Sequence, residues 1–248
     1  MIKKTISILF SCFLAIYSPT IFAKENKLFE YCTPEHQRSE ILNLKPHSFK
    51  EDGRPRATVG VILYSYDRNG EGYILLARER IDDKDQKSAG KYSEFGGSIE
   101  LNSKLESETF LEASLRELKE ESAGTYKLTK NEFLKNTFSS CYQNTKKREV
   151  VISIGNAPLY ISSHDLSKAR NNSKEANAKD KDEFRWLSIN DLLNIKDFIA
   201  TKHKIKTIDN LKEEITFRSY FLEYLQDPNF RKILQELIMV NHSKQKAA

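Results

Sequence analysis

The sequence predicts an α/β protein, and three features support this fold class. Two runs at residues 58–66 and 73–80 are rich in β-branched, aliphatic and aromatic residues, and the 67–70 segment between them (Asp-Arg-Asn-Gly) is typical of a hairpin turn. A helix with leucines at helical spacing is expected next, and a β-rich run at 150–162 follows it. We therefore expect a mixed β-sheet that is covered by helices.

The predicted central helix has one apolar stripe and one acidic face. Leu111, Leu115 and Leu118 follow at i, i+4 and i+7, which places them on one side of the helix. We expect Ser107 to be the N-cap residue, with Glu108 in the first turn. Because the acidic face is a different side of the helix from the leucines, we do not expect its carboxylates to be simply buried.

Glu117, Glu120 and Glu121 project from the same face, since they are spaced i, i+3 and i+4. Like charges at this spacing repel each other by roughly 0.2–0.5 kcal/mol per pair in an isolated helix. A compact set of carboxylate oxygens suits a hard divalent cation such as Mg²⁺ or Mn²⁺. A solvated acidic face without a ligand is the alternative interpretation.

The residues around the three glutamates resemble the Nudix box of the Nudix hydrolases. The string Glu-Phe-Gly-Gly-Ser-Ile-Glu at 94–100 precedes Glu108, seven residues separate Glu108 from Arg116, and Arg-Glu-Leu-Lys-Glu-Glu follows at 116–121. Every specified position from Glu108 to Glu121 matches the family pattern. Two departures occur: about five residues, 101–105, are inserted after Gly97, and Ala123 stands where glycine is expected, with Gly124 one place later as a displaced C-cap.

The resemblance implies a Nudix-like α/β/α sandwich and a pyrophosphohydrolase activity with Mg²⁺ or Mn²⁺ as cofactor. It implies that Glu117, Glu120, Glu121 and the carbonyl of Gly97 bind the metal, and that Arg116, together with Glu108, orients the glutamates. An ion pair of Arg116 with Glu112 is the structural alternative for that arginine. The general base is either Glu120 or an acidic residue further along the chain; the candidates are Glu175, Asp180, Asp182 and Glu183.

The implied substrate is a small molecule, a nucleoside diphosphate linked to another moiety. Arg78 and Glu100 are candidate substrate contacts. A non-catalytic module that keeps the fold and binds a phosphorylated ligand or partner is the alternative function. The formal charge of +5 falls by two if Lys3 and Lys4 are removed, which does not favour nucleic acid as a partner, although capped RNA stays open.

The N-terminus has the form of a secretory signal peptide. Lys3 and Lys4 precede an apolar run, and the residues Thr-Ile-Phe-Ala at 20–23 precede a polar segment. We predict cleavage after Ala23 and a periplasmic or secreted protein, with no membrane attachment after cleavage. An uncleaved transmembrane anchor is the alternative.

Cleavage would remove Cys12 and leave Cys32 and Cys141. An even number of cysteines suits an oxidising compartment, so we predict a disulfide between these two residues. Two reduced, buried thiols are the alternative.

The rest of the chain predicts one domain with extensions. A lead-in segment at 24–55 precedes a Nudix domain at 56–200, and a helical extension is expected at 201–248 because apolar residues recur at helical spacing. The polar stretch at 163–182 shows no periodicity and is longer than an ordinary connection, so we expect either a lid or a disordered loop. The oligomeric state stays open.

Overall fold

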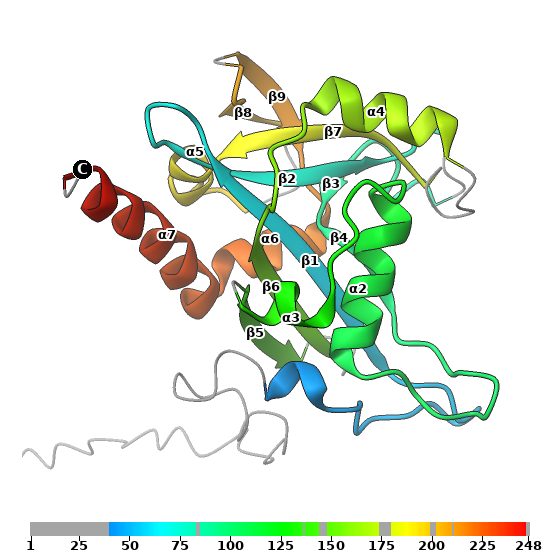
Figure 1. Cartoon of the computed structure of the whole chain (residues 1–248). Helices are drawn as coiled ribbons and strands as arrows, with labels where there is room; N and C mark the ends of the chain where they lie inside the picture. The colour runs from blue at the N-terminus through cyan, green and yellow to red at the C-terminus, as the bar shows by residue number, and fades with distance from the viewer. Residues whose placement is uncertain are drawn as a thin grey trace, which may run out of the picture.

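The computed structural model describes residues 40–82, 85–135, 137–143, 148–173, 180–198, 202–209 and 211–246. Figure 1 shows the elements coloured along the chain. The predicted signal peptide at 1–23 and Cys32 lie outside these residues, so export and the disulfide stay predictions. Within the described ranges, no helix is long and apolar enough to cross a membrane.

The centre of the fold is a seven-stranded mixed sheet built around β1 (Ala57–Tyr66). On one side, β1 pairs in parallel with β6 (Glu149–Asn156). On the other side, its first half pairs antiparallel with β4 (Phe95–Ser98) and its second half with β2 (Gly72–Glu79). The outer strands are β3 (Tyr92–Ser93), β7 (Lys181–Ser188) and β5 (Thr137–Gln143). The predicted mixed sheet is therefore confirmed.

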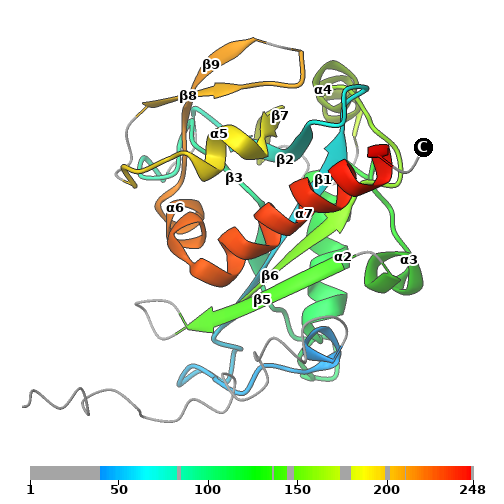
Figure 2. The same cartoon turned by 90° about the vertical axis from the view of Figure 1, so that its left-hand side faces the viewer.

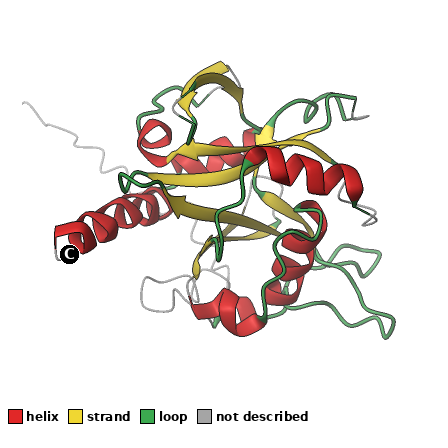
Figure 3. Ribbon diagram, turned by 45° about the horizontal axis from the view of Figure 1, so that its top comes forward, coloured by secondary structure: helices red, strands yellow, loops and turns green. Residues whose placement is uncertain are grey.

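Side chains alternate between two separate cores on the two faces of the sheet. Val59, Val61 and Leu63 enter one core, whereas Ile62 enters the other. Figures 2 and 3 show helices on both faces, which confirms the predicted α/β/α sandwich. The first core is covered by α2 (Phe110–Glu121), α3 (Lys130–Lys135) and α4 (Ser163–Asn172). The second is covered by α5 (Ile189–Leu193), α6 (Ser219–Gln226) and α7 (Pro228–Lys246).

The helix α2 begins two residues later than predicted. Its N-cap is Thr109, which forms a capping box with Glu112: the Thr109 side chain accepts from the Glu112 backbone N–H at 3.2 Å, and the Glu112 side chain accepts from the Thr109 N–H at 3.0 Å. Ser107 cannot be the N-cap because it forms a β-bridge with Leu101. The residues inserted after Gly97 therefore form a small turn that delays the start of the helix.

The C-terminal end of α2 also differs from the expectation. Ala123 itself adopts the left-handed conformation, with φ 57°, and Gly124 follows with φ 71°. The N–H of Gly124 donates to the carbonyl of Lys119 at 2.7 Å, which satisfies one of the last helical carbonyls. The cap is thus not displaced by one residue, because Ala123 accepts a conformation that glycine adopts more easily.

Two segments differ from the predicted structure. Residues 163–172 form α4 and not an aperiodic loop, with Ser162 as N-cap and Leu166 as the buried residue; residues 174–179 lie outside the described part. The helical prediction is wrong for 202–216, because β8 (Lys202–Lys206) and β9 (Lys212–Thr216) form an antiparallel hairpin. The predicted C-terminal helices are present only after it, as α6 and α7.

The end of this hairpin returns the chain to the central sheet. Phe217 forms a bridge with Tyr92 of β3, and the backbone N–H of Arg218 donates to the carbonyl of Tyr92 at 3.0 Å. Helix α6 starts at this point. Its first turn therefore lies next to the strand that leads into Gly96 and Gly97.

Candidate active site

The glycine pair of β4 packs directly against the acidic face of α2. The backbone N–H of Gly96 donates to Oε2 of Glu121 at 2.7 Å. A Cβ atom placed on Gly97 would lie 2.6 Å from Cδ of Glu117, so a side chain there would displace the Glu117 carboxylate. Two glutamates of the predicted metal set therefore contact the two glycines that precede the helix in sequence.

The three glutamates differ in their exposure to solvent. Glu117 and Glu121 are buried, at 7% and 6% exposed, whereas the Glu120 side chain is 22% exposed. The expectation that the acidic face escapes burial is thus wrong for two of the three. The reason is that α2 is enclosed on two sides: its leucines pack into the core, and its acidic face turns toward β4.

Arg116 connects four acidic residues of this region. Its Nε and Nη2 atoms donate to the two carboxylate oxygens of Glu108, both at 2.9 Å. Nη1 lies 2.7 Å from Oε1 of Glu117, 3.5 Å from Oε2 of Glu120 and 3.9 Å from Oε1 of Glu100. Nη2 also donates to the carbonyl of Ser98 at 3.0 Å. The guanidinium therefore ties α2 to the preceding loop.

The alternative pairing of Arg116 with Glu112 has no support in this structure. Glu112 is engaged in the capping box of α2 and in an ion pair with Lys130 at 3.2 Å. The arginine is thus placed where it can hold the glutamates, as the family resemblance implies.

A buried lysine that the sequence did not single out lies beside Glu121. Nζ of Lys181, on β7, is 2.6 Å from Oε1 of Glu79 and 3.3 Å from Oε1 of Glu121. The Lys181 side chain is 1% exposed. Nη1 of Arg218 lies 2.7 Å from the same Glu79 oxygen. This buried network joins the Nudix-box helix, the sheet and the start of α6, which are far apart in sequence.

Burial changes the protonation of these groups. It raises the pKa of Glu121 to about 8, although Lys181 acts in the opposite direction. Burial also raises the pKa of Glu117, against the lowering effect of Arg116. For Lys181, burial lowers the pKa, but Glu121 and Glu79 outweigh it, so the pKa is raised and the lysine stays charged.

The carboxylate and carbonyl oxygens of this region are ligands that suit a hard divalent cation. Glu117, Glu120, Glu121 and the Gly97 carbonyl would hold the ion, while Arg116 and Lys181 balance the glutamates. Among the described residues, no three His, Cys, Asp or Glu side chains are arranged as a preformed metal site. Binding would therefore require the three glutamates to move closer together.

The two predicted substrate contacts lie in different places. Glu100 is near the box, with its side chain 64% exposed and 3.9 Å from Arg116. Arg78 is bound by Asp182 and Glu183, each at 2.6 Å, and it lines a separate hollow with residues of α4 and β7. The structure therefore does not bring Arg78 into the glutamate cluster.

The structure does not bring the predicted general-base candidates beyond the box into the glutamate cluster. Asp182 and Glu183 are paired with Arg78, and Glu175 lies outside the described residues. Asp180 is exposed, and its carbonyl accepts from the N–H of Arg80 at 3.1 Å. Glu120 is the candidate that the structure places within the box itself.

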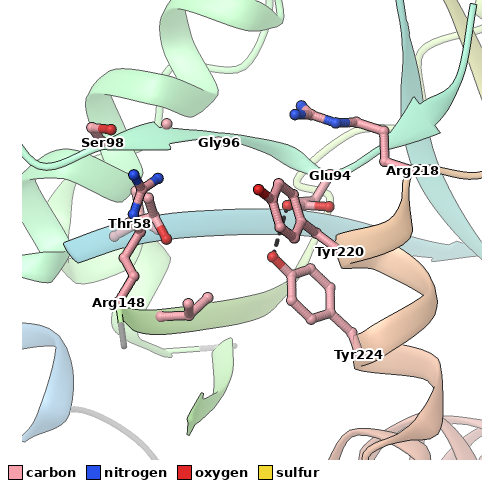
Figure 4. A pocket seen from close by; sticks show the side chains of 11 residues that line it. Thr58, Glu94, Gly96, Ser98, Arg148, Arg218, Tyr220 and Tyr224 are labelled. Carbon is pink, nitrogen blue, oxygen red and sulfur yellow. Dashed lines mark hydrogen bonds between the residues drawn. The ribbon is translucent and has the colours of Figure 1, made fainter. Parts of the chain in front are cut away.

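A cavity of about 140 Å³ adjoins Gly96 and Gly97 between the sheet and α6. Figure 4 shows Tyr220 and Tyr224 projecting from α6 toward Glu94, with Arg148 on the opposite side. The sequence did not mark this cavity, because Glu94 read only as part of a strand and the tyrosines only as part of an apolar helix. The contributing segments are far apart in sequence, and the bridge between Tyr92 and Phe217 brings the start of α6 beside β3.

Glu94 is an unusual carboxylate in this cavity. Its Oε1 atom accepts from the Tyr224 hydroxyl at 3.0 Å, while Oε2 is shielded from solvent and has no hydrogen-bond partner among the described residues. Burial raises the pKa of Glu94, and Arg218 opposes this effect. A buried polar atom without a partner costs about 1–3 kcal/mol, and more when the group is charged.

Comparison with known protein families gives the class of this protein. The NUDIX domain family model matches residues 54–211. The solved structures that are similar to the chain include the following two. One is a Nudix hydrolase from M. smegmatis, RenU, with 15% identity, a TM-score of 0.35, and coverage of 79% of this chain and 94% of that one. The other is a C. elegans Ap4A hydrolase binary complex, with 14% identity, a TM-score of 0.32, and coverage of 56% and 84%.

No curated protein matches the sequence. The family match covers more than half of the chain and includes the whole box and the sheet around it. The chain therefore belongs to the NUDIX domain family, and it is a Nudix-type pyrophosphohydrolase. The match ends before β9, α6 and α7.

Proposed function

We propose that this protein hydrolyses a pyrophosphate bond in a nucleoside diphosphate linked to another moiety, with Mg²⁺ or Mn²⁺, outside the cytoplasm. Glu117, Glu120, Glu121 and the Gly97 carbonyl hold the metal. A bound divalent ion neutralises phosphate oxygens and lowers the pKa of a water molecule. Arg116 and Glu108 keep the glutamates in position, and Glu120 is the candidate general base because it is the most exposed of the three.

The observation that carries the proposal is the packing of Gly96 and Gly97 against Glu121 and Glu117. A surface helix with a merely solvated acidic face would not need a neighbouring strand without side chains. Here the absence of a side chain at Gly97 is what leaves room for the Glu117 carboxylate. The backbone of Gly96 and Gly97 is partly exposed and lies beside the glutamates that would hold the metal.

The experiment is a substrate panel with Mg²⁺ or Mn²⁺. The panel contains nucleoside triphosphates, ADP-ribose, NADH, dinucleoside polyphosphates, nucleotide sugars and capped RNA, and product release is measured by chromatography. Glu120→Gln should reduce turnover by at least about 100-fold. Glu236→Gln on α7 is the matched control, because that glutamate forms only an exposed pair with Lys232. Full activity of Glu120→Gln, or binding without turnover of any compound, would favour the non-catalytic alternative.

Export is tested separately from catalysis. The signal-peptide pattern at residues 1–23 supports it, and N-terminal sequencing of protein from cell fractions should find a mature chain that starts at Lys24. An intact N-terminus on protein in the cytoplasmic fraction would remove the proposed location without affecting the proposed chemistry.

A further inference from the structure

Helix α6 lies beyond the family match, yet it forms one wall of the cavity beside the Nudix box. The match ends at residue 211, whereas Arg218, Tyr220 and Tyr224 all line the cavity. The opposite wall comes from β1, β4 and the start of β6 and includes Thr58, Glu94 and Arg148. A segment outside the family match therefore closes a space next to the predicted catalytic glutamates.

The position of Glu94 in this cavity depends on a glycine in the neighbouring strand. Gly60 pairs with Gly96 across β1 and β4, and a Cβ atom on Gly60 would lie 2.6 Å from Cγ of Glu94. The Glu94 side chain thus occupies space that only glycine leaves free. The Tyr224 hydroxyl fixes one carboxylate oxygen, and the other, Oε2, has no partner among the described residues. Such an acceptor calls for a donor that the polypeptide does not supply.

The size and lining of the cavity indicate which kind of ligand could carry this hydrogen-bond donor. The cavity volume of about 140 Å³ is close to the roughly 150 Å³ that can hold a molecule the size of benzene, so the cavity has room for one ring. Tyr220 offers an aromatic face, over which the Arg218 guanidinium lies at 5.5 Å from the ring centroid. Gly96 and Gly97 line the cavity and also contact Glu121 and Glu117. A ring in the cavity would therefore lie beside the same two glycines that contact the box glutamates.

We propose that Glu94 and α6 form the specificity pocket, in which a ring of the substrate bearing an N–H or O–H donor binds to Oε2 of Glu94 and packs against Tyr220. The proposal rests on the proposed function, since it places the phosphates of the substrate at the glutamates. The donor chemistry is shared by a nucleobase and by a ribose ring. Glu94 and Tyr220 are assigned to substrate recognition and not to the hydrolytic step.

The test measures binding and turnover independently. Metal-free protein is titrated calorimetrically with AMP, GMP, CMP, UMP and ribose 5-phosphate, which need no hydrolysis. Binding of ribose 5-phosphate as tightly as the nucleotides identifies the ribose as the ring, and a preference among the four bases identifies the base. Glu94→Gln replaces an acceptor by an amide of the same shape and should weaken the tightest-binding compound by about tenfold or more.

Tyr220→Ala is the second variant, because Tyr220 is only partly buried and lies on α6, outside the sheet. It should weaken the same compound, while Glu236→Gln on α7 should not. In the hydrolysis assay, Glu94→Gln should raise KM by the same factor and leave kcat within about threefold. If the two variants bind the compound more weakly but the unaltered protein hydrolyses no substrate, the proposed function is overturned and the pocket proposal stands. The proposal is overturned if none of the five compounds binds, or if both variants bind them as tightly as the unaltered protein.

Discussion

Nζ of Lys181 lies 3.3 Å from Oε1 of Glu121, and both side chains are buried. The lysine comes from β7 and the glutamate from the last turn of α2, so a fixed cation of the protein sits beside a predicted ligand of the metal. Its partner Glu79 lies on β2 and is also bound by Arg218. The amino group of Lys181 therefore contributes both to the stability of the fold, through Glu79, and to the charge around the predicted metal ligand Glu121.

Replacing Lys181 by methionine should strongly destabilise the protein. The substitution would leave Glu79 and Glu121 buried without this cation, and removing one partner of a buried ion pair costs about 3–5 kcal/mol. Lys202→Met is the control, because the Lys202–Glu214 pair on the β8–β9 hairpin is exposed and worth less than about 1 kcal/mol. Guanidinium chloride unfolding measures both. Equal losses in the two variants would contradict the assigned role of Lys181.

Metal binding should depend on pH through Glu121. Burial raises its pKa from 4.5 to about 8, so the folded, metal-free protein holds a proton that the unfolded chain releases. This contribution to the free energy of unfolding is fully present below about pH 4.5 and is lost as the pH rises through about 8. A metal ion needs the ionised carboxylate, so Mg²⁺ affinity should increase by up to about 50-fold between pH 6 and pH 8.

The Mg²⁺ affinity is measured from the shift of the thermal unfolding temperature across a metal titration at each pH. Glu121→Gln carries no titrating carboxyl and should lose most of this pH dependence. An affinity that is the same at both pH values would show that Glu121 is already ionised at pH 6 and that burial does not control it.

Gly97→Ala should disrupt the active site more than the fold. The new Cβ atom would lie 2.6 Å from Cδ of Glu117, which forces that carboxylate away from β4. A displacement of about 1 Å at a catalytic group can lower the rate by about 100-fold. Steady-state hydrolysis and a Mg²⁺ titration of the activity measure the loss. Glu236→Gln on α7, which lies outside the box and the cavity lining, should keep normal activity. Unchanged Mg²⁺ dependence in Gly97→Ala would argue against Glu117 as a ligand.

The predicted Cys32–Cys141 disulfide can be tested on the exported protein. Cys141 lies on β5, is 7% exposed and is paired in register with Val151 of β6, whereas Cys32 lies outside the described residues. Closing a loop of roughly 100 residues would stabilise the fold by about 4–5 kcal/mol in the chain-entropy model. Mass mapping without reductant should find the linked peptides, and Cys32→Ala should lower stability only under oxidising conditions. Alkylation of both thiols in the native, oxidised protein would disprove the bond.

Several elements were predictable because their signals are local. The hairpin of β1 and β2 follows from two apolar runs around an Asp-Arg-Asn-Gly turn, and α2 follows from its leucine stripe. Helix α4 was missed because Leu166 is its one buried residue, so it shows little periodicity. The β8–β9 hairpin was read as helix, although Ile215 and Phe217 are spaced by two, as in a strand; helical spacing begins only with Phe217 and Phe221.

The sequence predicts which glutamates form the acidic cluster, but it does not predict whether they are buried or which residues surround them. Spacing on one helix places Glu117, Glu120 and Glu121 on one face, yet it cannot say whether that face meets solvent or a strand. Burial of Glu117 and Glu121 results from contact with β4, and the charge that compensates Glu121 comes from Lys181, about sixty residues later in the chain.

The sequence alone determined the family and the box, and it predicted the glutamates that a metal would use, because these depend on residue types at fixed spacing along one segment. The tertiary structure decided which carboxylates are buried, which cation lies beside them and which segment closes the cavity next to Gly96. Those properties depend on distances between β7, α6 and β4, which are set by packing and strand pairing across the whole chain. Glu94 shows the difference: its place before Gly96 is visible in the sequence, but the bond from Tyr224 to Oε1 and the burial of Oε2 without a partner arise only in the folded chain.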